Sequence, residues 1–128
     1  MKIATGVDLV DIARFHETIE RHGDRFLRRI FTPHELEEMG ANITSLAGRF
    51  AAKEAVAKAL GTGIGAVTWH DVEVLRGPQR QPLLHLHGEA LRLAGELCLQ
   101  NWAISLSHTH THAIATVVAT GNDTFEVR

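Results

Sequence analysis

The sequence has little cysteine, no strong excess of charge and no long apolar run. Cys98 is the single cysteine among 128 residues, which excludes an internal disulfide and favours a core residue of a cytoplasmic protein. The formal net charge is −2 with histidine neutral, so any electrostatic partner has to be bound by a local patch. No run is long enough for a membrane span, and the first residues lack the apolar core of a signal peptide. We therefore expect a soluble protein of one domain, residues 1–128.

Hydrophobic periodicity predicts an α+β fold with the element order β-α-α-α-β-β-α-β-β, in which an antiparallel-rich sheet packs on helices. Thr32, Pro33 and Glu35 form the signature of a helix start, with a capping box, and that helix should end near Met39. Gly23 is a weak point in the helix before it. The expected strands cover 3–10, 72–74, 83–86, 102–107 and 113–119, and the expected helices begin at 11, 33, just after Thr44 or Ser45, and at 89, the last ending at 100. A turn at Gly77-Pro78 should join the second and third strands into a hairpin.

The stretch GRFAAKEAVAKALGTGIG, residues 48–65, combines a carboxylate, lysines and glycines at helical spacing. Glu54 and Lys58 lie one turn apart on one face of a helix. Its alanines keep the helix surface thin, so that a neighbouring backbone or a ligand can come close. Gly61 is placed to close the helix in the left-handed conformation, and the glycines beyond it let backbone N–H groups approach an anion. The pattern indicates a magnesium and phosphate site, although a solvated helix with a glycine cap has the same local signature.

Four segments together resemble one enzyme family. They are GVDLVDIARF, FLRRIFTPHEL, GRFAAKEAVAKALGTGIG and SLSHTHTHAIATVV, and they span roughly residues 3 to 118. In order and spacing they are similar to the bacterial holo-acyl-carrier-protein synthases, which are 4'-phosphopantetheinyl transferases. The resemblance implies that a serine hydroxyl of an apo acyl carrier protein attacks the pyrophosphate of coenzyme A and expels adenosine 3',5'-bisphosphate.

The resemblance also implies residue roles. Asp8 and Glu54 match the family's two Mg²⁺ ligands, and hard carboxylate oxygens suit that ion. Lys58 matches the lysine of the same motif and is expected to offset charge on the leaving phosphate. The general base stays open among Asp8, Glu54 and a metal-ordered water. Without the resemblance, the local sequence would favour a different reading of Asp8, as a strand-end carboxylate satisfied by backbone N–H groups.

The expected coenzyme A contacts come from the central helix, the glycine loop and the penultimate strand. They are Arg49, Lys53, Lys58, Gly61, Thr62, Gly63, His108 and Thr109. Arg49 and Lys53 could bind the 3'-phosphate or make ion pairs instead. His108 matches the family's histidine near the coenzyme. His110 and His112 depart from the family pattern, and in a continuous strand all three imidazoles could hold Zn²⁺ or Ni²⁺. This alternative describes a non-catalytic metal-binding or scaffold trimer, whereas a turn rich in histidine and threonine is usually just solvated.

The partners expected from the resemblance are an acidic carrier protein and further copies of the chain. A stripe of arginines would lie along one side of the first helix if that helix runs straight through Gly23. The stripe consists of Arg14, Arg21, Arg25 and Arg28. It suits an acidic partner, although the same spacing is found on ordinary solvated helices. The family forms homotrimers with active sites between subunits.

Overall fold

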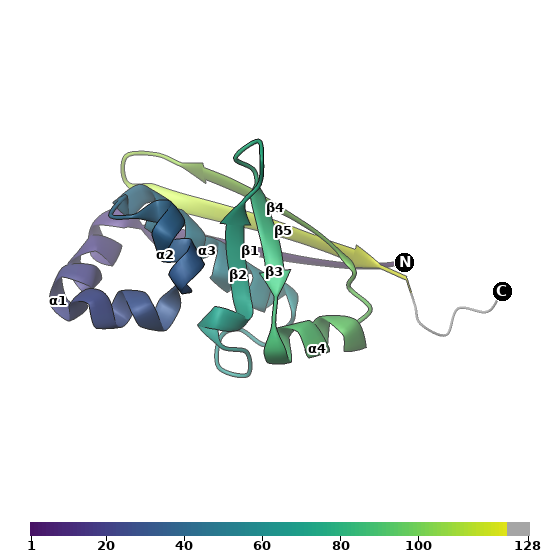
Figure 1. Cartoon of the computed structure of the whole chain (residues 1–128). Coiled ribbons are helices and arrows are strands. Elements are labelled where there is room, and N and C mark those ends of the chain that lie inside the picture. Colours follow the sequence, from purple (N-terminus) through teal and green to yellow (C-terminus); the bar gives the residue numbers. More distant parts are fainter. Residues whose placement is uncertain (123–128) are drawn as a thin grey trace.

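A three-stranded antiparallel sheet forms one layer of the molecule. The structure is a computed structural model and describes residues 1–122. The strand order is β1-β5-β4, with β1 at Lys2–Asp11, β4 at Asn101–His108 and β5 at His112–Gly121. Figure 1 shows these long strands side by side, with α1 and α2 gathered near one end. The predicted α+β class and element order are confirmed.

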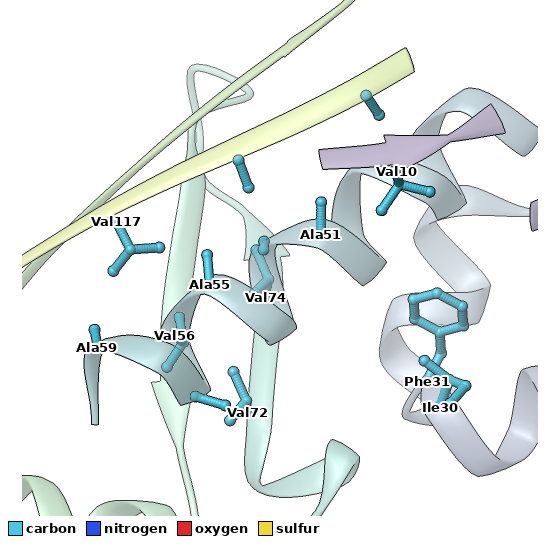
Figure 2. Close-up of a cluster of buried hydrophobic side chains, with 14 of the residues drawn as sticks. Val10, Ile30, Phe31, Ala51, Ala55, Val56, Ala59, Val72, Val74 and Val117 are labelled. Carbon is cyan, nitrogen blue, oxygen red and sulfur yellow. The ribbon is translucent and has the colours of Figure 1, made fainter. Parts of the chain in front are cut away.

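The central helix α3, Ile43–Ala59, packs on one face of this sheet. Its alanines are buried, and they meet the small residues of β5, from Ala113 to Ala119, in the hydrophobic core (Figure 2). Gly6 of β1 approaches so closely that a Cβ there would overlap the carbonyl oxygen of Ala55. The interpretation of this stretch as a solvated helix face is therefore wrong. The thin surface of α3 serves the close approach of a neighbouring strand backbone.

The second layer on α3 is the predicted hairpin. It consists of β2, Val72–Arg76, and β3, Pro82–Leu86, and is preceded by the short 3-10 helix η1, Trp69–Asp71. Helix α4, Gly88–Glu96, ends four residues before the predicted end at 100. The reason is local, since Cys98 has a positive φ of 61° and so cannot continue a helix.

Helices α1, Ile12–Ile30, and α2, Pro33–Met39, extend beyond the sheet. The capping box of Thr32 and Glu35 is confirmed. Asn42, rather than Thr44 or Ser45, caps α3, because its side chain accepts a hydrogen bond from the Ser45 N–H at 3.0 Å. Within the described residues, no helix is long and apolar enough to cross a membrane.

Gly23 interrupts α1 with φ 63° and ψ −149°. Figure 1 shows the resulting change in direction of α1. The condition for one straight stripe is therefore not met: Arg14 and Arg21 precede the kink, while Arg25 and Arg28 follow it.

The sheet face away from α3 is apolar and open. Strand alternation places Ile3, Val7 and Leu9 on this face, opposite Gly6, as the sequence predicts. Their exposed fractions are 67%, 51% and 61%, and Val118 of β5 is 45% exposed. Apolar residues gathered in this way on two paired strands are typical of a surface that binds another protein.

Candidate functional site

The close packing of β1 on α3 brings Asp8, Glu54 and Lys58 together. The Lys58 Nζ lies 3.0 Å from Asp8 Oδ1 and donates a second hydrogen bond, of 2.9 Å, to the Val7 carbonyl. Asp8 follows Gly6 by two residues, so it shares the face of β1 that meets the helix. The close approach at Gly6 is thus what brings the two carboxylates and the ammonium to one place.

Glu54 is half-buried and its carboxylate is electrostatically unfavourable. Burial raises its pKa above the ordinary 4.5, the charge of Asp8 raises it further, and Lys58 opposes both effects. One ammonium thus stands beside two acidic groups. A divalent cation would relieve this excess negative charge, and carboxylate oxygens are ligands that Mg²⁺ prefers. The donor set fits magnesium, with Asp8 and Glu54 as the residues that would hold it.

A hollow of about 550 Å³ opens at these carboxylates and is partly lined by aromatic rings. Phe15 lies between Phe26 and Phe50, with ring centroids 6.0 Å and 5.1 Å apart. Arg14 lines the same hollow as Asp8 and Glu54, so the first residue of the predicted stripe lies beside the candidate site. All four arginines of the stripe are exposed.

His108 and Arg49 line a different hollow, of about 410 Å³, which shares no residue with the first. Arg49 is buried, donates to the Val74 carbonyl and lies 3.1 Å from Glu38 Oε1. Arg76 and Arg80 of the hairpin line the same hollow. Sequence reasoning missed these two residues, because only the fold brings the hairpin beside α3.

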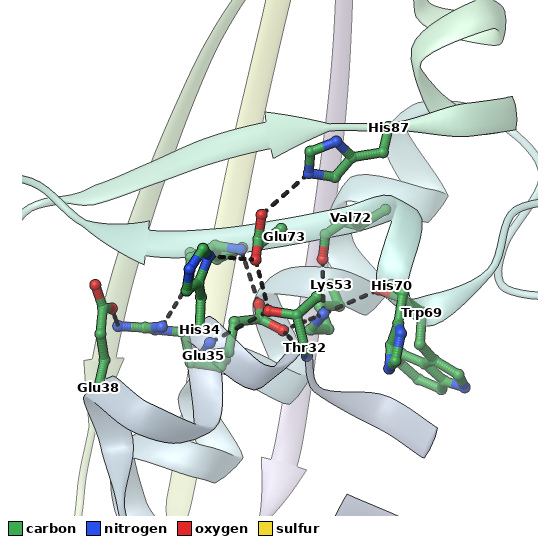
Figure 3. A network of polar contacts seen from close by, with 12 residues as sticks. Thr32, His34, Glu35, Glu38, Lys53, Trp69, His70, Val72, Glu73 and His87 are labelled. Carbon is green, nitrogen blue, oxygen red and sulfur yellow. Dashed lines mark hydrogen bonds and ion pairs between the residues drawn. The ribbon is translucent and has the colours of Figure 1, made fainter. Parts of the chain in front are cut away.

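The prediction that Lys53 contacts coenzyme A is contradicted by the structure. Lys53 is fully buried and lies 2.7 Å from Glu35 Oε1, which is also fully buried. Figure 3 shows it enclosed between α2 and the start of β2. Its ammonium is committed to interior acceptors, so a ligand at the surface cannot reach it.

The three histidines do not form a cluster. His108 pairs with Ala113, whereas His112 pairs with Asp11. Ala113 and His112 are neighbours on β5, so His108 and His112 lie on opposite faces of the sheet. Within residues 1–122, no three histidine, cysteine or acidic side chains are grouped closely enough to hold a metal ion. The three-histidine metal site, and the scaffold function built on it, are therefore not supported.

Thr109 and the glycine loop have local roles that the sequence anticipates only in part. The Thr109 hydroxyl accepts hydrogen bonds from the N–H groups of Thr111 and His112, at 3.2 and 3.1 Å, and so closes the turn between β4 and β5. Gly61 has a φ of 83°, which confirms the predicted left-handed end of α3. Thr62 and Gly63 follow, with their N–H groups bonded to the Ala57 carbonyl at 3.3 and 3.1 Å.

Known proteins resemble this chain along most of its length. The model of the 4'-phosphopantetheinyl transferase superfamily matches residues 4–117. The holo-acyl-carrier-protein synthase of Herpetosiphon aurantiacus is 45% identical over 126 residues, covering 93% of this chain and 99% of the relative. That of Geobacter sulfurreducens is 47% identical over 122 residues, covering 92% and 97%.

A solved structure of the same enzyme type is also similar. The Helicobacter pylori holo-acyl-carrier-protein synthase in complex with coenzyme A has a TM-score of 0.83 and 34% identity, and the match covers 91% of this chain and 99% of that one. The sequence comparisons and the structural comparison thus point to the same family along nearly the whole chain. The chain therefore belongs to the 4'-phosphopantetheinyl transferase superfamily.

Proposed function

We propose that this protein is a magnesium-dependent holo-acyl-carrier-protein synthase. It transfers the 4'-phosphopantetheine arm of coenzyme A to a serine of an apo acyl carrier protein and releases adenosine 3',5'-bisphosphate. The observation that carries this proposal is the group of Asp8, Glu54 and Lys58, held together by the packing of β1 on α3. The family and the coenzyme A complex of the Helicobacter pylori relative support it.

The chemistry needs little beyond positioning and charge neutralisation. The serine oxygen forms a bond to the phosphorus attached to pantetheine, and the bond from that phosphorus to the bridging oxygen breaks. Bound Mg²⁺ would neutralise pyrophosphate charge, and Asp8 and Glu54 would hold it. Lys58 offsets the charge that develops on the leaving phosphate. The serine proton passes to Glu54, to Asp8 or to an ordered water.

Coenzyme A is proposed to bind across two surfaces. The arginines around the second hollow, Arg49, Arg76 and Arg80, suit the phosphates of the nucleotide end, and the His108 imidazole lines the same hollow. The glycine loop after Lys58 suits the pyrophosphate because glycines carry no Cβ to hold a bulky anion away, while the N–H groups of Gly61, Thr62 and Gly63 keep the loop attached to α3. Thr109 lies in the turn directly after His108 and is proposed to contact the coenzyme at the same place.

Because the two hollows are separate in one chain, we propose that a site is completed by two subunits of a homotrimer. The open apolar face formed by Ile3, Val7, Leu9 and Val118 is suited to such an interface, because burying it removes apolar surface from water. In this arrangement, Asp8, Glu54 and Lys58 come from one subunit and His108 from its neighbour.

The carrier protein is proposed to dock on the exposed arginines of α1. Arg14 and Arg21 lie on the segment next to the carboxylates, and Arg25 and Arg28 extend the basic surface beyond the kink. An acidic partner would be steered there by charge.

Mass spectrometry tests the function directly. Incubation with an apo acyl carrier protein, coenzyme A and Mg²⁺ should add one phosphopantetheine mass to the carrier, and the Glu54→Gln protein should not add it. If no carrier protein of the fatty-acid, polyketide or peptide type gained this mass, the proposal would be contradicted.

A further inference from the structure

Lys53 is a buried ammonium on the helix that carries Glu54 and Lys58, and the proposed reaction does not use it. Its side chain has no exposed surface. The Nζ pairs with Glu35 at 2.7 Å and donates to the carbonyl oxygens of Trp69, at 2.9 Å, and Val72, at 2.7 Å (Figure 3). Three acceptors match the three N–H bonds of an ammonium, so its hydrogen-bonding capacity is full.

The Trp69 carbonyl lies directly after the glycine loop, residues 61–68, and the Val72 carbonyl lies at the start of β2, on the other side of η1. The loop leaves α3 at Gly61 and ends at Trp69, the first residue of η1. The Trp69 ring stacks on Phe50, with centroids 4.9 Å apart and planes at 27°. Phe50 and Lys53 are three residues apart on α3, so one helix face holds both the ring and the carbonyl of Trp69.

The other end of the loop is attached to the same helix. The N–H groups of Thr62 and Gly63 donate to the Ala57 carbonyl, and the Gly61 N–H donates to the Lys58 carbonyl at 2.9 Å. Both ends of the loop are therefore tied to α3. Its middle, including Gly65 and Ala66, is exposed.

We infer that Lys53 is a positioning residue that closes the glycine loop onto the helix of Glu54 and Lys58. The inference rests on the proposed function, in which this loop faces the pyrophosphate of coenzyme A. A loop ordered before binding does not have to lose its conformational freedom when the coenzyme arrives, and affinity increases accordingly. Loss of Lys53 is then expected to act on the KM for coenzyme A more than on kcat.

Glu35 has a separable role. Its second oxygen accepts the Val74 N–H at 2.8 Å, and its first also accepts the Thr32 N–H at 2.9 Å, so it ties α2 to β2. Burial lowers the pKa of Lys53, and Glu35 opposes that effect. A neutral amine still has two N–H bonds to donate. The two carbonyl contacts of Lys53 can therefore persist after the charge of Glu35 is removed.

This separation supplies a matched pair of variants. Lys53→Met keeps a long side chain and removes the contacts to Trp69 and Val72 together with the ion pair to Glu35. Glu35→Gln keeps its shape, removes the charge and replaces one of the two accepting oxygens by an NH2 group, so it also loses a backbone contact between α2 and β2. Lys53→Met should speed amide hydrogen exchange in residues 61–68 and raise the KM for coenzyme A roughly tenfold, as expected if the ordered loop falls to about a tenth of the population. Glu35→Gln should lower the melting temperature but leave loop exchange and KM within about twofold of wild type.

Several results would overturn the inference. One is loop exchange in Lys53→Met equal to that in the wild type, and another is an equal rise in KM in both variants, which would show a general effect of stability. If Lys53→Met does not fold, the double variant Glu35→Gln/Lys53→Met removes both buried charges, and its loop exchange decides the question. Hydrogen exchange in residues 61–68 can be measured on protein that has no activity. If the wild type did not transfer phosphopantetheine, the proposed function would be refuted, and the effect of Lys53 on the loop could still be determined.

Discussion

At the residue scale, the candidate metal site depends on two carboxylates, Asp8 and Glu54, with the Lys58 ammonium paired to Asp8. Asp8→Asn and Glu54→Gln keep side-chain shape and remove one charge each. We expect each to lower transfer by a factor on the order of 100 or more, comparable to the loss of a main electrostatic contact. Their combined effect should be less than additive, because both groups serve one ion. Steady-state kinetics with melting curves as the folding control tests this, and near wild-type transfer by either variant would show the site to be wrong.

The raised pKa of Glu54 gives the site a pH signature. A group whose pKa is higher in the folded protein stabilises it at pH values below the ordinary value of 4.5, and that contribution is lost as pH rises through the raised pKa. Without Mg²⁺, the melting temperature of wild type relative to Glu54→Gln should therefore fall across this window. Added Mg²⁺ should reverse the fall, since the metal competes with the proton. A constant difference between the two proteins at every pH would contradict this account.

At the element scale, the approach of β1 to α3 sets the position of Asp8. Gly6→Ala places a Cβ against the backbone of Ala55, which cannot move aside as a flexible side chain could. We expect a loss of roughly 1–3 kcal/mol in the free energy of unfolding, typical of overpacking, together with reduced transfer. Gly95→Ala in the exposed part of α4 is the control, because its added Cβ meets no atom within 4 Å. Chemical denaturation compares the two, and equal stabilities would mean that the strand is not held tightly.

The arginines in the first segment of α1 are expected to affect binding of the carrier protein and not binding of coenzyme A. Arg14→Glu and Arg21→Glu should raise the KM for the carrier protein and weaken its dependence on salt, while coenzyme A affinity is unchanged. Lys2→Glu makes the same change of charge at the far end of β1 and should have little effect. If calorimetry instead finds weaker coenzyme A binding in the arginine variants, these residues belong to the nucleotide site.

At the scale of the whole molecule, separate hollows in one chain lead to a test of sites shared between subunits. Asp8→Asn and His108→Ala damage different hollows. In mixed trimers a site can take intact Asp8 from one variant and intact His108 from the other. At low coenzyme A, a co-refolded equal mixture should recover about a quarter of wild-type transfer if subunits assemble at random. Activity equal to the mean of the two separate variants would place each complete site within one chain.

Local sequence was sufficient for features whose cause lies within a few residues. The capping box of Thr32 and Glu35, the left-handed Gly61 and the hairpin follow from short-range geometry, and the structure confirms them. The family was also recognisable, because its motifs keep their order and spacing along the chain. The roles assigned to Asp8, Glu54 and Lys58 stay predictions, although the structure brings the three together.

Tertiary packing decided what short-range patterns leave undetermined. Lys53 and Lys58 are the same residue type on one helix, yet Lys53 is fully buried and Lys58 is half exposed. Because α3 is covered on several sides, the face that stays open depends on which elements pack there. Lys53 meets Trp69, 16 residues away, and Lys58 meets Asp8, 50 residues away. The sequence determined the family, the element order and the local caps, whereas the structure decided which charges are buried, because that depends on contacts between residues far apart in the chain.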